Sequence, residues 1–180
     1  MALVHHVVEP GIVTGLPTRM MSLGGGLVVP YPKPVNGAAT RFGKGNRRTN
    51  TGPEIRLRSS LHRRGLRFRK DSVVRTPTAR VRADVVFPAA RVAVFVDGCF
   101  WHGCPEHQRV PRRNAEYWGP KLQRNAARDH DVNAALVHAG WHVERIWEHE
   151  DPSAAAERVE RAVRSRRVSG GSGKATPRRQ

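Results

Sequence analysis

A dense run of metal-binding residue types, DGCFWHGCPEH at residues 97–107, constrains the fold of this chain more than any other feature. Cys99, Cys104 and His107 form a C-x4-C-x2-H array, and zinc binds thiolate and imidazole ligands in a tetrahedral site. The fourth ligand must come from a distant segment, and we expect His149, since neighbouring strands would bring both loops to one end of a sheet. Two buried reduced cysteines beside incidental histidines are the alternative explanation.

The chain contains only two cysteines, and a disulfide between them would close too short a loop to stabilise the fold much. The N-terminus lacks the basic start, continuous apolar core and cleavage site of a signal peptide. No apolar run approaches the roughly 20 residues of a spanning helix. We therefore expect a cytoplasmic protein with reduced thiols and no membrane partner.

The chain is strongly basic, with 32 Lys and Arg against 15 Asp and Glu and a net charge of +17. The stretch 41–82 alone carries 14 Lys and Arg against two acidic residues. This imbalance favours a polyanionic partner, because fixed positive charge displaces the counterions condensed on nucleic acid. Nucleic acid is therefore the partner that charge predicts, and within the cytoplasm we expect the protein to be associated with the nucleoid.

Three parts of the chain differ in composition. Residues 1–38 are rich in Gly and Pro without a helical or strand period, which predicts an irregular N-terminal extension. Residues 168–180 have almost no apolar content, which predicts a disordered basic tail. The remaining residues, 39–167, are long enough for one compact domain that buries a core without disulfides.

The domain begins with an amphipathic helix. Thr51 and Glu54 form a capping-box pattern, with a proline between them where its missing N–H is harmless. Ile55, Leu57 and Leu61 supply the apolar positions, and a glycine at position 65 ends the helix.

Short apolar or alternating segments predict strands at 66–69, 81–87, 92–96 and 141–147. Helical periods predict two more helices, at 114–139 and from 151 to about 167. Gly140 ends the first of these, and Val159 and Val163 mark one face of the second. This order predicts an α/β fold with a mixed sheet flanked by helices.

Several segments resemble one family in the correct order. They are TGPEIRLRSSLHRRGLRFR, FVDGCFWHGCPEH, NAEYW, KLQRNAARD and GWHVERIWE. They resemble the very-short-patch-repair (Vsr) DNA mismatch endonucleases over about residues 41–148. The resemblance implies a restriction-endonuclease-like fold with a structural zinc site. It also implies magnesium-dependent nicking of double-stranded DNA at T:G mismatches that arise when 5-methylcytosine deaminates. A monomer with a functional link to a DNA cytosine methyltransferase is expected.

The resemblance also implies roles for individual residues. Asp84 matches the family's magnesium-binding aspartate, and Val96 matches a position that supplies a main-chain carbonyl to that metal. Their hard oxygen atoms suit Mg²⁺. His102 matches the general base, Asp129 the acidic residue that orients it, and Glu54 an acidic residue near the metal or the phosphates. A histidine near neutral pH can accept a proton from water activated at the metal.

Each of these residues has a simpler explanation. The capping box alone accounts for Glu54, and Asp129 at helical spacing could pair with Arg124 or Arg128. His102 lies between the two cysteines and could be a zinc ligand itself.

Phe100, Trp101 and Trp118 match the aromatic residues with which the family contacts DNA beside the mismatch. Aromatic wedges enter a base stack most easily where pairing is already defective, so they favour mismatched DNA. Core packing is the alternative for all three.

The chain departs from the family pattern at several positions. Ala83 stands where a proline commonly precedes the metal aspartate, His149 stands where a cysteine is frequent, and residues 71–81 lack the usual glycine-rich run. Two other functions therefore remain open: a restriction-type or other nuclease of the same fold, and a zinc-stabilised DNA-binding module without catalysis. The module would need neither Asp84 nor His102.

Overall fold

The structure is a computed structural model that describes residues 20–22, 28–30, 49–107, 112 and 114–171. Most of the expected extension at 1–38, and residues 172–180 of the expected tail, lie outside the described residues. Within the extension, strands β1 (Met20–Ser22) and β2 (Val28–Pro30) pair antiparallel. The sequence did not predict them, because strands of three residues are too short to display a period.

The central sheet has four strands in the order β3 (Arg69–Arg75), β4 (Arg80–Phe87), β5 (Val92–Asp97) and β6 (His142–Trp147). β3, β4 and β5 are antiparallel neighbours, whereas β5 and β6 are parallel. The predicted mixed sheet is therefore confirmed. The parallel pair directs the chain after β5 and the chain after β6 to the same end of the sheet.

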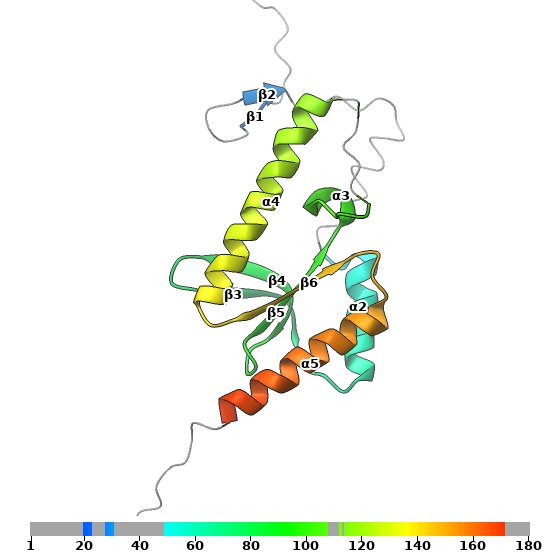
Figure 1. The fold of residues 1–180 in the computed structure, drawn as a ribbon, viewed down its shortest axis with the longest axis vertical. Coiled ribbons are helices and arrows are strands. Elements are labelled where there is room, and N and C mark those ends of the chain that lie inside the picture. Colours follow the sequence, from blue (N-terminus) through cyan, green and yellow to red (C-terminus); the bar gives the residue numbers. More distant parts are fainter. Residues whose placement is uncertain (1–19, 23–27, 31–48, 108–111, 113, 172–180) are drawn as a thin grey trace, which may run out of the picture.

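Helices cover both faces of this sheet (Figure 1). One core lies on the side of α2 (Gly52–Arg63) and α5 (Pro152–Gly171), where both expected valines of α5, Val159 and Val163, are fully buried. The other core lies under α4 (Ala115–His138) and contains Leu136 and Phe95. The result is the three-layer restriction-endonuclease-like arrangement that the sequence predicts. No helix in the described part of the chain is both long and apolar enough to cross a membrane.

Three local expectations were wrong. The segment 66–69 is not a strand: Leu66 is buried in the turn after α2, its N–H bonded to the Leu61 carbonyl, and β3 begins only at Arg69. Ile55 is 50% exposed, because the buried face of α2 follows Leu57 and Leu61, four residues apart, and Ile55 lies outside that spacing. The helix α5 runs to Gly171, past the expected end near residue 167.

A short helix, α3 (Cys99–His102), occupies the part of the Cys/His run where a loop was expected. The Glu148 carboxylate accepts a 2.8 Å hydrogen bond from the Cys99 N–H at its start. A side chain at Gly98 would come within 3.3 Å of the Trp101 ring, so this turn favours glycine. At the other end, Gly103 adopts a left-handed conformation with φ of 74°. This single turn fixes where the residues between the two cysteines point.

Candidate active site and metal centre

The β4–β5 pairing opens at Asp84. Backbone pairing between these strands runs from Phe87↔Val92 to Val85↔Val94. Just beyond it the Asp84 side chain accepts a 2.7 Å hydrogen bond from the Val96 N–H, so a carboxylate takes the place of a backbone partner. The alternation of β4 also shifts by one residue here, since Ala83 packs under α4 whereas Val85 packs toward α2 and α5.

Burial raises the pKa of Asp84 from 3.8 to about 6. The Val96 N–H opposes this shift, and the nearby carboxylates of Glu54, Asp97 and Asp71 add to it. On the other side of β4, the β3–β4 pairing skips Asp71, which stands opposite Asp84. Asp71 has a positive φ of 44°, a conformation that is uncommon in residues other than glycine. The Asp84 carboxylate therefore lies in a position that is unfavourable for its own charge. Such positions are frequent in functional sites.

His102 and Asp129 form the second part of the site. His102 Nδ1 lies 2.6 Å from Asp129 Oδ2, and both side chains are largely buried, with 22% and 17% of their surface exposed. Asp129 does not form the ion pairs with Arg124 or Arg128 that its helical spacing allowed; its second oxygen faces Arg145 at 3.2 Å. The contact brings together a residue of α3 and a residue of α4.

Glu54 is buried at the start of α2 and has two functions in the structure. Its carboxylate accepts hydrogen bonds from the Asn50 N–H, the Thr51 hydroxyl and Arg58, at 2.9 to 3.0 Å. This is a variant of the expected capping box, because the Thr51 hydroxyl donates to Glu54 and caps no N–H. Glu54 also lines the cleft that contains Asp84.

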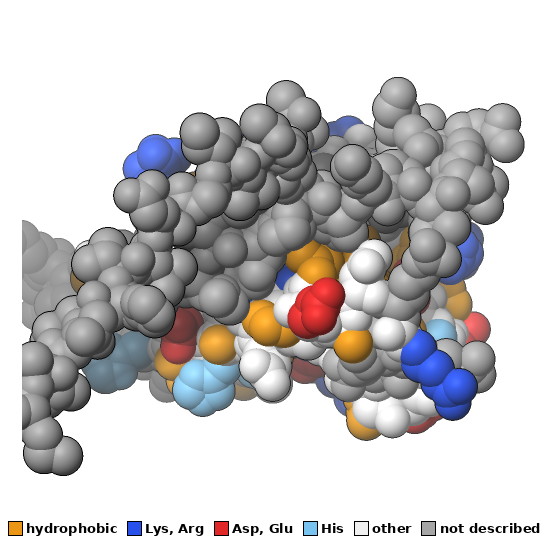
Figure 2. Space-filling model, turned by 90° about the horizontal axis from the view of Figure 1, so that it is seen from above, with side chains coloured by type: hydrophobic (Ala, Val, Ile, Leu, Met, Phe, Trp, Pro, Cys, Tyr) orange, Lys and Arg blue, Asp and Glu red, His pale blue; other side chains and the backbone are white. Residues whose placement is uncertain are grey.

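Asp84, His102, Asp129 and Glu54 all line one cleft of about 720 Å³. Its wall also includes the exposed basic residues Arg80, Arg82 and Arg128. Figure 2 views the molecule from above; where that face is coloured by side-chain type, a few acidic side chains lie beside hydrophobic ones and Lys and Arg side chains lie toward the edges. The structure thus brings together in one cleft four residues that lie far apart in the chain.

Three further cleft residues were missed by the sequence analysis: Asp97, Arg145 and Glu148. Asp97 is only 3% exposed and Arg145 contacts its carboxylate. The signal that could have indicated them is a charged residue at the end of a buried strand and another in the middle of β6.

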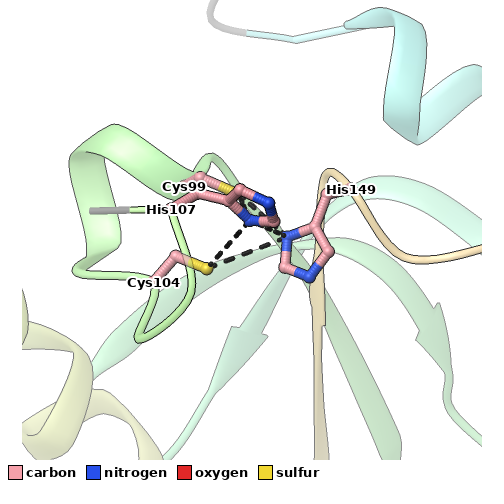
Figure 3. A group of neighbouring side chains, drawn as sticks. All are labelled: Cys99, Cys104, His107 and His149. Atoms are coloured by element: carbon pink, nitrogen blue, oxygen red, sulfur yellow. Dashed lines mark hydrogen bonds between the residues drawn. The ribbon is translucent and has the colours of Figure 1, made fainter. Parts of the chain in front are cut away.

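The predicted zinc ligands form a separate cluster (Figure 3). Cys99, Cys104, His107 and His149 each offer one ligand atom, and these atoms lie within 4.8 Å of one another. His149 follows β6 and meets the α3 segment because β5 and β6 are parallel. His102 is not part of this group; its ring contacts Asp129.

The geometry of the cluster fits a tetrahedral metal. Bonds of about 2.3 Å to sulfur and 2.0 Å to nitrogen imply ligand-to-ligand distances of roughly 3.3 to 3.8 Å. His149 Nδ1 lies 3.0 Å from Cys99 Sγ and 3.8 Å from Cys104 Sγ. His107 Nδ1 lies 3.6 Å from Cys104 Sγ, 4.0 Å from Cys99 Sγ and 3.2 Å from His149 Nδ1, so the separations are close to those of a tetrahedral site. Burial and the neighbouring Cys104 raise the pKa of Cys99 to about 11. A bound cation would stabilise the thiolate form and offset this rise in pKa. These four residues could hold a metal ion.

Phe100, Trp101 and Trp118 pack together beside the cleft. Their ring centroids are 4.9 to 5.7 Å apart in tilted or edge-on contacts. Lys121 lies 5.3 Å from the centroids of both tryptophan rings. All three aromatic side chains are partly exposed and none belongs to the two hydrophobic cores. The simple alternative of core packing therefore does not describe them.

A partly buried carboxylate at a break in strand pairing, a histidine–aspartate couple and a basic rim are the parts needed to hydrolyse a phosphodiester. Together with the mixed sheet they point to a nuclease, and the similarity to known proteins supports the class of DNA endonucleases. The sequence profile of the family described as "DNA mismatch endonuclease Vsr" matches residues 40–108. The chain belongs to this Vsr family, as the relatives below also indicate.

The type II nicking enzyme V.NaeI of Lentzea aerocolonigenes is 52% identical over 122 residues, which cover 67% of this chain and 74% of the relative. The type II nicking enzyme V.XorIIP of Xanthomonas oryzae pv. oryzae is 44% identical over 106 residues, which cover 57% and 73%. The DNA mismatch endonuclease Vsr of Escherichia coli is 35% identical over 103 residues, which cover 55% and 62%.

Proposed function

We propose that this endonuclease nicks double-stranded DNA at T:G mismatches left by deamination of 5-methylcytosine, the reaction that begins very short patch repair. The observation that carries the proposal is the 2.6 Å contact between His102 and Asp129 in the cleft that contains Asp84. A DNA-binding module without catalysis has no use for this arrangement. A DNA cytosine methyltransferase is the proposed functional partner, because it makes the base whose deamination creates the substrate.

Asp84 and the main-chain carbonyl of Val96 would hold Mg²⁺ in this proposal. Both offer hard oxygen atoms, and Mg²⁺ usually needs few protein ligands because it keeps several waters. The raised pKa of Asp84, about 6, supports the assignment, since a cation offsets the charge that burial disfavours. A bound Mg²⁺ would supply positive charge against the phosphate as negative charge develops there.

His102 would act as the general base. Its Nδ1 faces the Asp129 carboxylate, so the neutral ring carries its proton on Nδ1 and leaves Nε2 free to accept one. A water oxygen would attack phosphorus while one of its protons moves to Nε2. The bond to the leaving oxygen would break, and that oxygen would take a proton from solvent to become a hydroxyl group. Asp129 holds the ring and stabilises the imidazolium that forms. Glu54, which also lines the cleft, would act near the metal or the phosphates.

The aromatic cluster would provide the preference for a mismatch. Phe100, Trp101 and Trp118 would enter the base stack next to the T:G pair, where unstacking is easiest. Arg80 and Arg128 at the cleft margin would contact phosphates without reading sequence. The Cys/His cluster would hold a structural zinc ion that fixes the α3 segment carrying both His102 and two of the rings.

One second candidate has support of its own. Two of the relatives above are called type II nicking enzymes, so the same chemistry could act on fully paired duplexes. The cleft residues would keep their roles, and only the aromatic cluster would lose its purpose.

One assay separates the candidates. The protein is incubated with Mg²⁺ or with EDTA and with duplexes that differ only in a T:G or a C:G pair. The proposal expects Mg²⁺-dependent nicking of the T:G duplex with little cleavage of the other, and loss of nicking in His102→Ala. Equal nicking of both duplexes would support the second candidate. Binding without nicking under any condition would identify a DNA-binding module.

A further inference from the structure

Arg145, a cleft residue, contacts three polar side chains: Asp97, Asp129 and Asn133. Its Nη1 contacts both carboxylate oxygens of Asp97, at 2.9 and 2.7 Å. Its Nη2 lies 3.2 Å from Asp129, and its Nε donates to Asn133 at 3.1 Å. All three guanidinium nitrogens therefore have an acceptor, and the group also lies 5.0 Å from the ring centroid of Phe95.

Burial of the charged Asp97 carboxylate would be unfavourable without this arginine. It is 3% exposed, and a buried carboxylate needs a charged partner. The sheet places the two residues together: Phe95 pairs with Arg145 and Asp97 with Trp147 in the parallel β5–β6 register, so Asp97 and Arg145 are diagonal neighbours on one face. That face is the one covered by α4, which carries Asp129 and Asn133.

The contacts continue to the catalytic histidine. His102 Nδ1 has two carboxylates nearby, Asp129 at 2.6 Å and Asp97 at 3.6 Å. Without a cation between them, these two carboxylates would repel each other and compete for the same N–H. Arg145 contacts both carboxylates: it faces Oδ1 of Asp129 and leaves Oδ2 of Asp129 directed at His102.

We propose that Arg145, anchored by the buried Asp97, is a positioning residue for nicking: it fixes the Asp129 carboxylate in the orientation that holds His102. This inference rests on the proposed roles of His102 and Asp129. A lysine at position 145 is a poor substitute, because a single ammonium group cannot reproduce a planar fork that contacts two carboxylates and an amide at once.

The test compares Arg145→Gln with Arg64→Gln in single-turnover nicking of a T:G duplex with Mg²⁺, alongside DNA affinity measured without nicking. Arg64 is a matched control, because it forms a 2.8 Å ion pair with Glu160 and is 29% exposed, close to the 21% of Arg145, and it lies outside the cleft residues. Partners that orient an active-site group typically contribute about 10- to 100-fold to activity. Arg145→Gln should slow nicking by that factor with DNA affinity within about threefold of wild type. Arg145→Lys should not restore the rate, and Arg64→Gln should leave it unchanged.

A double-mutant cycle distinguishes positioning from a general structural effect. If Arg145 acts through Asp129, then Arg145→Gln should slow an Asp129→Asn enzyme by less than about threefold, because the carboxylate it orients is already gone. An undiminished effect in that background would overturn the proposal. So would a loss that appears only in DNA affinity, which would place Arg145 against a phosphate.

Arg145→Gln leaves Asp97 buried without its partner, and this variant could unfold. The double variant Asp97→Asn/Arg145→Gln removes both charges and keeps the test valid. By circular dichroism the double variant should be folded, and it should nick as slowly as the single variant, whereas a wild-type rate in the double variant would overturn the proposal.

His102→Ala separates this inference from the proposed function. Loss of nicking in His102→Ala together with normal nicking in Arg145→Gln would reject only the role of Arg145, whereas normal nicking in His102→Ala would reject the function.

Discussion

The acidic cleft and the Cys/His cluster lie at the same end of the sheet and share the α3 segment. They differ in the type of ligand atom that they offer. The cleft gathers oxygen ligands and a histidine held by a carboxylate. The cluster gathers two thiols and two imidazoles within 4.8 Å, with the thiols buried. Hard oxygen atoms suit Mg²⁺ in an open site, and sulfur with nitrogen suits zinc in a closed one. Residues only a few positions apart thus belong to two different sites, to which the proposed function assigns catalysis and stability respectively.

The largest expected effect tests the cluster. Cys104 is fully buried, and structural zinc in small domains contributes apparent binding energies on the order of 10 kcal/mol, comparable to the whole stability of a domain. Cys104→Ser should lose zinc, by elemental analysis, and unfold at a much lower temperature. His102→Ala, two residues away and outside the cluster, should retain both zinc and stability. Wild-type protein purified without chelators that contains no zinc would contradict the ligand assignment.

The next effect tests the cleft. Asp84→Asn removes the proposed magnesium ligand and should reduce nicking by about 10³-fold or more while most DNA affinity remains. Asp131→Asn is a suitable control, because Asp131 is an exposed acid on α4 with 83% of its side chain accessible. Nicking by Asp84→Asn at the wild-type rate would exclude the assignment.

Asp84→Asn should lower the nicking rate but raise the stability of the fold at neutral pH. Burial raises the pKa of Asp84 from 3.8 to about 6, so the folded state binds this proton more tightly than the unfolded state. The stabilising contribution is therefore complete below about pH 4 and is lost as pH rises to about 6, an effect of at most about 3 kcal/mol. In protein free of divalent cations, Asp84→Asn should be more stable than wild type at pH 7, and urea titrations across pH 4 to 7 measure this. A variant less stable than wild type at pH 7 would show that Asp84 contributes to folding.

A smaller effect concerns selectivity. Truncating Phe100 and Trp101 to Ala should reduce the preference for T:G over C:G duplexes more than the affinity for either, because phosphate contacts are untouched. Stacking contributes about 1 to 3 kcal/mol per base, or roughly one to two decades of discrimination per ring. Competition between the two duplexes measures it, with circular dichroism to verify folding. An unchanged T:G preference in the folded double variant would exclude the wedge.

The sequence predicted the residues of the two sites by different routes and to different extents. The spacing of Cys99, Cys104 and His107 indicates a local metal site, and parallel neighbouring strands were enough to add His149. The roles in the cleft came from the family resemblance, and the structure brings Asp84, His102 and Asp129 together. Asp97 and Arg145 could not be paired from sequence, because their contact depends on the β5–β6 register, and register is a property of the assembled sheet.

Local errors in the sequence analysis have the same origin. Apolar residues at Ile55 and Leu66 were counted as helix-face and strand positions, yet one faces solvent and the other fills the core from a turn. An apolar residue indicates a tendency to be buried, and the packing of the neighbouring elements decides which ones are. The sequence did not predict α3, because four residues are too few to show a helical period.

The smallest expected effect concerns charge at the margin of the cleft. Arg128 is exposed, lines the cleft and is adjacent to Asp129 in sequence, so Arg128→Gln should remove one phosphate contact. Binding would then weaken about equally for T:G and C:G duplexes, and the slope of log affinity against log salt would fall by about one. Arg161→Gln removes the same charge from α5, where Arg161 is 69% exposed and paired with Glu157, and it should leave the slope unchanged. A loss confined to the T:G duplex would instead assign Arg128 to mismatch recognition, and equal slopes for both variants would place the DNA away from this side of the cleft.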